Sequence, residues 1–210
     1  YNVCGCWRIQ HICRQLKTFN ADVVCLQEVV IESTFFRPAN QAEYLARALG
    51  GHHISAGFFR YPYGITGNVI ISRYGFRQKQ VLRDADGTGF GLGAVIDYAG
   101  SGVAIICGHY LFVPRPLPVG IAVTTFRRSA QIRRSLQWIR QGGLPAVIAG
   151  DFNCLPYTLE YRTVAAVMRD CSRAAPAHHR NTRPTWGLPA QIDYIFTTPH
   201  FRTLSYQTVD

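Results

Sequence analysis

The sequence lacks long apolar runs and carries few charges. None of its apolar runs approaches the length of a helix that spans a membrane, so no transmembrane segment is expected. Only 16% of the 210 residues are charged and 48% are hydrophobic, a balance that excludes an intrinsically disordered chain. The length suits one globular domain with a substantial core, and a monomer is expected.

Lysine is nearly absent, because Lys17 and Lys79 are the only lysines among the 22 basic residues. The formal net charge of +10 suggests a polyanionic partner, such as nucleic acid, an anionic membrane surface or a phosphorylated substrate. The arginines are scattered, however, and an arginine bias can also follow from the base composition of a genome. The charge alone leaves both interpretations open.

The sequence also lacks the Cys-x-x-Cys spacing of a zinc knuckle or a redox motif. Cys4 and Cys6 are one residue apart, and no matching Cys/His pair follows them, which argues against a zinc site. The total of seven cysteines is odd, and several lie in apolar segments. Buried free thiols in a reducing compartment are therefore expected, and this favours the cytoplasm.

The periodicity of apolar residues predicts more strands than helices. Helices are predicted at 8–19, 39–49, 124–141 and 158–169. Strands are predicted at 22–26, 52–59, 68–72, 76–82, 88–98, 103–107, 146–149, 192–197 and 203–209. The segments 61–67, 114–118 and 172–190 are expected to be irregular. Adjacent strands that read as hairpins favour mixed sheets covered by helices over a doubly wound parallel sheet.

The strongest local signal is the apolar strand 146–149, which runs through Gly150 into Asp151 and Asn153. A carboxylate beside an apolar strand is costly to bury unless it is paired or holds a metal. Asn153 points to the same side as Asp151 if the chain stays extended. An acid and an amide aimed at one point suit a hard cation or a phosphate oxygen. The alternative is an Asx-type turn.

Other polar side chains lie in, or just after, apolar strands. They are Asn2, Glu28, His109 and Asp193. If the strand ends gather at one edge of the sheets, these residues converge on a single site with Asp151 and Asn153. Structural alternatives exist for three of them: Glu28 could cap or approach the N-terminus of a following helix, His109 could be a half-buried imidazole, and Asp193 could pair with an arginine.

Six segments together resemble the endonuclease/exonuclease/phosphatase family, in the family's order and over essentially the whole chain. They are Tyr1-Asn2-Val3, Leu26-Gln27-Glu28-Val29, Gly67-Asn68-Val69-Ile70-Ile71-Ser72-Arg73, Gly108-His109-Tyr110-Leu111, Gly150-Asp151-Phe152-Asn153 and Ile192-Asp193-Tyr194-Ile195-Phe196. The resemblance implies a four-layered α/β/β/α sandwich of two mixed sheets flanked by helices. It also implies hydrolysis of a phosphoester with Mg²⁺ or Mn²⁺.

The resemblance also implies a role for each site residue. Glu28 resembles the metal-binding glutamate, with Asn2 beside it in the shell of the metal and the phosphate. His109 resembles the histidine that contacts the scissile phosphate, and Asn68 is expected near it. Asp151 resembles the aspartate that positions or activates the attacking water, and Asn153 its phosphate- or metal-contacting partner. Asp193 resembles the aspartate that orients a catalytic histidine.

That catalytic histidine belongs to a closing Ser-Asp-His element of the family, which these 210 residues do not contain. His200 is too close to Asp193 in the chain, and its context is different. A single domain is therefore expected that lacks the start of its first strand and the C-terminal Ser-Asp-His segment. A second departure is Cys4, where relatives often carry an acidic residue or a histidine.

The expected function is a metal-dependent phosphodiesterase acting on DNA, RNA or a phospholipid head group. The 61–63 loop and Trp186 could supply surfaces on which bases stack, although packing explains them equally well. One alternative is a phosphomonoesterase of the inositol-phosphatase kind, whose longer lysine-rich loops are not seen here. The other is a non-catalytic binding member of the family, although a scaffold has no need of costly carboxylates at strand ends.

Overall fold

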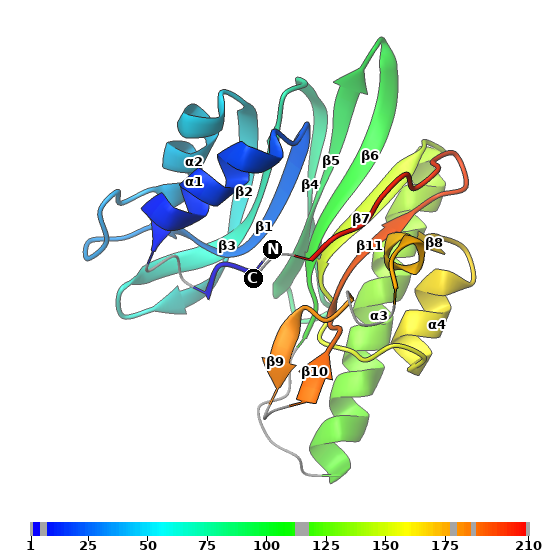
Figure 1. The fold of residues 1–210 in the computed structure, drawn as a ribbon. Helices are drawn as coiled ribbons and strands as arrows, with labels where there is room; N and C mark the ends of the chain where they lie inside the picture. The colour runs from blue at the N-terminus through cyan, green and yellow to red at the C-terminus, as the bar shows by residue number, and fades with distance from the viewer. Residues whose placement is uncertain (1, 5–7, 112–117, 177–179, 186–187, 209–210) are drawn as a thin grey trace.

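The computed structural model describes residues 2–4, 8–111, 118–176, 180–185 and 188–208, and these form two facing sheets with helices on the outside (Figure 1). The smaller sheet is antiparallel and contains, in spatial order, β1 (Val23–Glu32), β3 (Gly64–Ser72) and β2 (His52–Tyr61). The larger sheet is mixed and contains β4 (Phe76–Arg83), β5 (Gly89–Tyr98), β6 (Ser101–His109), β7 (Ala146–Asp151), β11 (Asp193–Thr197) and β8 (Arg169–Asp170).

The helices cover the two outer faces. The smaller sheet packs on α1 (Ile9–Phe19) and α2 (Gln41–Leu49) through buried residues that include Ile12, Leu26 and Leu45. The larger sheet packs on α3 (Pro118–Gly142) and α4 (Leu159–Ala165). A third cluster, with Ile70, Leu92 and Ile105, lies between the sheets. This arrangement confirms the predicted four-layered sandwich.

Local signals located the helices of the first half well. Ile9, Ile12 and Cys13 bury one face of α1, and Asn20 ends the helix in the left-handed conformation. In α2, the side chain of Asn40 accepts a hydrogen bond from the backbone of Glu43 and so caps the N-terminus. Within the described residues, no helix is long and apolar enough to cross a membrane.

The prediction of an irregular loop at 61–67 was wrong. Strands β2 and β3 form a hairpin that turns at Pro62-Tyr63, and Gly64 already pairs with Tyr61. Gly64 has a φ of +145°, and a Cβ atom there would lie 2.1 Å from the carbonyl oxygen of Glu32. The loop-like composition therefore serves a tight turn and a close backbone approach, while strand pairing continues on both sides.

Three other predictions differ near the C-terminus. The described part of 203–209 forms no strand, and the second neighbour of β11 is β8. The helix predicted at 158–169 ends at Ala165, because the chain then turns into β8. The segment 172–190 contains a 3₁₀ turn, η2 (Cys171–Ala174), and a hairpin of β9 (Arg183–Thr185) and β10 (Leu188–Ala190). Pairing with neighbouring segments of the chain, and not local propensity, determines these short strands.

The cysteines whose structure is described are free thiols, as predicted. Cys13, Cys107, Cys154 and Cys171 are buried, Cys25 is half-buried and Cys4 is exposed. Cys6, Trp186 and most of the proline-rich loop at 114–118 lie outside the described residues.

Candidate active site

A bulge in β1 presents Glu28. Leu26 pairs with Val69 and Val29 pairs with Gly67, so Gln27 and Glu28 together oppose the single residue Asn68. Glu28 has a φ of +59°, an uncommon backbone conformation for a non-glycine residue. The sequence predicted that the strand would end before Glu28. Instead the strand continues, and the bulge allows Leu26 and Val29 to remain in the core while the carboxylate is redirected.

The side chain of Asn2 joins the two sheets at this point. Its amide nitrogen donates to Glu28 Oε1 at 2.8 Å and to Asp151 Oδ2 at 3.3 Å, while its oxygen accepts from the backbone of Cys4 at 2.9 Å. Asn2 is positioned by a bridge to Gln27. One amide therefore lies between two carboxylates that come from different sheets.

Strand register brings the remaining residues together. His109 on β6 is paired with Asp151 on β7, and Asp151 is paired with Asp193 on β11. Immediately before them, Gly108 pairs with Gly150, and a Cβ atom on Gly150 would lie 2.0 Å from the carbonyl oxygen of Gly108. Glycine at this position permits the close strand approach that places the three side chains along one edge.

His109 lies close to Glu28, with 3.8 Å between Nε2 and Oε1. Burial lowers the pKa of His109, and the negative charges of Glu28 and Asp193 only partly oppose this effect, so the imidazole is held toward its neutral form. Nδ1 is buried and has no hydrogen-bond partner among the residues that the structure describes. The ring also meets the edge of Phe59, with 5.7 Å between ring centroids.

Asp151 and Asn153 adopt a geometry that combines both sequence interpretations. The backbone N–H of Asn153 donates to Asp151 Oδ1 at 2.9 Å, so an Asx-type turn is present. Asn153 has a φ of +49°, and its side chain donates to the carbonyl oxygen of Tyr110 at 3.0 Å. Both oxygens of Asp151 thus have partners within the site, through Asn153 and Asn2.

Asn68 is fully buried beneath these residues. Its amide nitrogen donates to the carbonyl oxygen of Cys107 at 2.9 Å, and this contact joins the two sheets just before His109. Within the described part of the chain, its side-chain oxygen has no hydrogen-bond partner.

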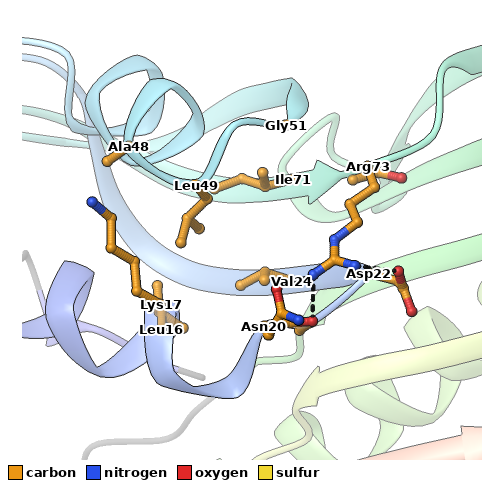
Figure 2. Close-up of a pocket in the computed structure, with 12 residues that line it drawn as sticks. Leu16, Lys17, Asn20, Asp22, Val24, Ala48, Leu49, Gly51, Ile71 and Arg73 are labelled. Atoms are coloured by element: carbon orange, nitrogen blue, oxygen red, sulfur yellow. Dashed lines mark hydrogen bonds and ion pairs between the residues drawn. The ribbon is translucent and has the colours of Figure 1, made fainter.

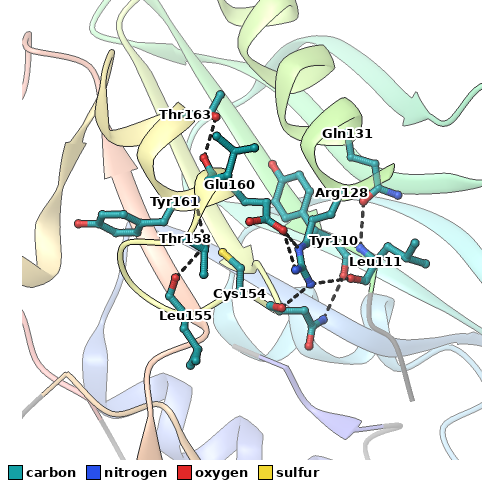
Figure 3. A network of polar contacts seen from close by, with 12 residues as sticks. Tyr110, Leu111, Arg128, Gln131, Cys154, Leu155, Thr158, Glu160, Tyr161 and Thr163 are labelled. Carbon is teal, nitrogen blue, oxygen red and sulfur yellow. Dashed lines mark hydrogen bonds and ion pairs between the residues drawn. The ribbon is translucent and has the colours of Figure 1, made fainter. Parts of the chain in front are cut away.

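An ion pair that the sequence did not predict, between Arg128 and Glu160, lies next to the site (Figure 3). Arg128 on α3 donates through Nε and Nη2 to Glu160 Oε1 at 2.9 and 2.7 Å, and through Nη1 to the carbonyl oxygen of Asn153 at 2.5 Å. The side chain of Glu160 is 2% exposed and that of Arg128 is 12% exposed. The available signal was Thr158 followed by Glu160, a helix N-terminus with an acid in its first turn.

Asp193 lies where its negative charge is unfavourable. Burial and the charge of Asp151 raise the pKa of Asp193 to about 6, although Thr182 and His109 oppose the shift. The folded state therefore binds a proton more tightly than the unfolded state, and stability is lost as the pH rises through about 6.

We expect Asp193→Asn to stabilise the metal-free domain at pH 7, because the uncharged amide avoids burial of a carboxylate. The gain should be on the order of 1–3 kcal/mol and should vanish near pH 4. Urea unfolding in EDTA at pH 4, 5.5 and 7 measures the difference. A variant that is less stable than the parent at pH 7 would contradict the assigned environment of this carboxyl.

The donor set fits a hard divalent cation. Within the described residues, no three His, Cys, Asp or Glu side chains are close enough to form a metal site alone. The carboxylate of Glu28 is nevertheless an oxygen donor of the kind that Mg²⁺ and Mn²⁺ prefer, and Asn2 would add its amide oxygen, which accepts from the Cys4 backbone in this structure. Mg²⁺ commonly keeps several waters beside one or two carboxylates. Asp151 places a second negative charge next to the same Asn2 amide.

Of two pockets in the structure, the larger adjoins this site and the smaller lies away from it. A cleft of about 1130 Å³ is lined by Asn2 and Asp193, and by apolar side chains of the larger sheet such as Ile105 and Val147. A smaller cavity of about 160 Å³ lies between α1, α2 and β1, with Lys17 and Arg73 at its edge (Figure 2). Its Arg73 contacts Asn20 and Asp22 at the beginning of β1, away from the bulge at Glu28.

Comparisons with known proteins agree with this fold. The family model described as "Endonuclease/Exonuclease/phosphatase family" matches residues 1–210. The uncharacterised protein YbhP of Escherichia coli K12 is 25% identical over 153 residues, which cover 66% of this chain and 56% of YbhP. The chain therefore spans about half the length of the curated relatives it matches.

Solved structures give the same result. A Bacteroides vulgatus protein described as an endonuclease/exonuclease/phosphatase superposes with a TM-score of 0.70 at 21% identity, covering 91% of this chain and 78% of that one. D. rerio TDP2, solved with a single-strand DNA product, has a TM-score of 0.68 at 20% identity, with coverage of 94% and 81%. With the family model matching every residue, this chain belongs to the endonuclease/exonuclease/phosphatase family, whose members are hydrolases acting on phosphoester bonds.

Proposed function

We propose that this domain hydrolyses phosphodiesters, with Mg²⁺ or Mn²⁺ as cofactor and nucleic acid or a phospholipid head group as substrate. The observation that carries the proposal is the Asn2 amide between the carboxylates of Glu28 and Asp151, with His109 beside Glu28. A site that only bound substrate would not need two carboxylates close together, because their mutual repulsion is costly.

Each residue of the site has a separate role in the proposed reaction. Glu28 and Asn2 would hold the cation, which when bound neutralises phosphate oxygens and the charge that develops on them. Asp151, which is 5% exposed, positions the attacking water and accepts a proton from it. His109 and Asn153 donate to phosphate oxygens as negative charge builds up. Asn68 holds β6 in place close to His109 through the Cys107 carbonyl.

Asp193 would orient a histidine of the kind that a Ser-Asp-His segment supplies, and residues 1–210 contain no such segment. If a longer chain supplies that histidine, it should hydrolyse substrate about 10²–10⁴-fold faster than residues 1–210 alone, the range usual for acid–base groups. Equal rates would contradict this part of the proposal.

Nucleic acid is the favoured substrate on two grounds. The net charge of +10 suits a polyanion, and the similar D. rerio TDP2 was solved with a single-strand DNA product. A phospholipid head group is the alternative, and cleavage of a small diester without cleavage of DNA would favour it.

The test is hydrolysis of bis(p-nitrophenyl) phosphate, p-nitrophenyl phosphate and plasmid DNA by the natural full-length protein, with Mg²⁺, Mn²⁺ or EDTA. We expect metal-dependent cleavage of the diester and of plasmid DNA. Cleavage of the monoester alone would make the protein a phosphomonoesterase. Binding of metal without cleavage of any substrate would favour a non-catalytic member of the family.

A further inference from the structure

A row of aromatic rings connects the segment after β1 with the turn between β2 and β3, and it has no role in the chemistry described above. It consists of Phe35, Phe36, Tyr63 and Tyr61, and we call it the aromatic ledge. Successive ring centroids are 5.3, 5.5 and 5.0 Å apart. The rings at its two ends are open to solvent, because Phe35 is 68% exposed and Tyr61 is 41% exposed. Large aromatic rings left exposed in a row often mark a binding surface.

The ledge adjoins the phosphate site. Phe59 contacts the ring of His109, and Tyr61 follows on the same side of β2, since its pairing with β3 is regular from Phe59 to Tyr61. Partial burial raises the pKa of Tyr61 and Tyr63, and the negative charge of Glu28 adds to this shift. A group bonded to a phosphate at Glu28 and His109 therefore has the ledge within reach.

The ledge is preorganised by its backbone. Ser33 Oγ donates to the carbonyl oxygen of Tyr63 at 2.5 Å and accepts from the backbone N–H groups of Phe35 and Phe36 at 3.0 and 2.9 Å. These bonds tie the segment after β1 to the turn between β2 and β3. Tyr61 and Tyr63 are nearly parallel, with 3° between their planes, so one flat ring rests on another. A ligand that stacks here meets rings whose positions are already fixed.

We propose that the aromatic ledge is a subsite for an unpaired nucleobase of a single-stranded nucleic acid, with Tyr61 as the stacking ring. This inference rests on the proposed function, because the base would reach the ledge when a phosphate of the same strand binds at Glu28 and His109. Every base presents a flat face that stacks on such rings without regard to sequence, whereas a paired base in a duplex does not. The exposed guanidinium of Arg37, which bonds to carbonyl oxygens of Thr34 and Phe36, adds positive charge next to the rings.

The test compares binding of a short oligothymidylate with an abasic oligomer of equal length and charge, by fluorescence anisotropy of the full natural chain in EDTA. Without bound metal, cleavage does not interfere, and both ligands present the same phosphates. We expect oligothymidylate to bind at least ~5-fold more tightly. Tyr61→Ala should remove that preference, and Tyr61→Phe, which keeps the ring, should retain it.

Phe126→Ala is the matched control, because Phe126 is 70% exposed and lies on α3, outside the larger sheet. It should leave both affinities unchanged. Equal binding of the two oligomers, a failure of both to bind, or an equal loss for both in Tyr61→Ala would overturn the inference. Hydrolysis of bis(p-nitrophenyl) phosphate without base preference would overturn this inference alone, and base preference without hydrolysis would overturn the proposed function alone.

Discussion

Glu28→Gln and Asp151→Asn are each expected to lower kcat/KM for a phosphodiester by at least ~10²-fold. Both substitutions keep the shape of the side chain and remove its negative charge. The Asn2 amide lies 2.8 Å from the first carboxylate and 3.3 Å from the second, so each change acts at the junction of the two sheets. Rates of bis(p-nitrophenyl) phosphate hydrolysis by the full natural chain measure the effect.

The two variants should differ in how they respond to metal. Glu28→Gln removes a proposed metal ligand, so more Mg²⁺ or Mn²⁺ should be needed for half-maximal rate. Asp151→Asn removes the proposed water-orienting group, so the rate at saturating metal should fall with less change in the metal requirement. A titration of rate against metal concentration distinguishes these outcomes.

Glu32→Gln provides the control for the charge change, because Glu32 is the exposed last residue of the same strand. It should leave both the rate and the metal requirement unchanged. If Glu28→Gln and Asp151→Asn stay within about threefold of the parent, the carboxylates are not part of the reaction and the proposed site is wrong.

Glu160→Ala is expected to destabilise the domain by about 3–5 kcal/mol, because it leaves the guanidinium of Arg128 buried without its carboxylate. Glu160 accepts two hydrogen bonds from Arg128, and its own side chain is 2% exposed. Arg128→Lys should be milder but still harmful, since a lysine cannot bond to Glu160 and to the Asn153 carbonyl with one planar group. Urea unfolding monitored by circular dichroism measures both.

An exposed ion pair gives the matched comparison. Arg47 bonds to Glu43 one helical turn away on α2, and their side chains are 80% and 44% exposed. Arg47→Ala should change the free energy of unfolding by no more than ~0.5 kcal/mol. A loss of similar size for Glu160→Ala would mean that the Arg128–Glu160 pair is not buried as described.

The double variant Arg128→Met with Glu160→Met separates stability from positioning. Replacement of both partners by apolar side chains should recover much of the lost stability. The Asn153 carbonyl would still have no donor from α3, so we expect the rate of diester hydrolysis to remain below that of the parent. Recovery of both stability and rate would show that Arg128 does not position Asn153.

The order of elements followed from local chemistry, and the sequence by itself therefore determined the family and most of the fold. Apolar spacing and Asn20 defined α1, and alternation with turn residues defined β4 and β5. Short apolar strands that are followed by Glu28 or Asp151, or that contain Asp193, marked the candidate site, because burial of an unpaired carboxylate beside a strand is costly.

Only the tertiary structure decided how those residues meet. The bulge that redirects Glu28 depends on its pairing with β3, and the alignment of His109 with Asp151 and Asp193 depends on the register of β6, β7 and β11. Register is a property of paired strands, so no local pattern reports it.

The ion pair and the hairpin turn near the site could not be predicted from the sequence either. Arg128 and Glu160 lie 32 residues apart, and nothing near either residue indicates its partner. The segment at 61–67 has the composition of a loop, and it becomes a hairpin turn with stacked tyrosines because β2 and β3 pair on both sides of it. The sequence determined which side chains bring the chemistry, and long-range pairing of the backbone decided where each of them points.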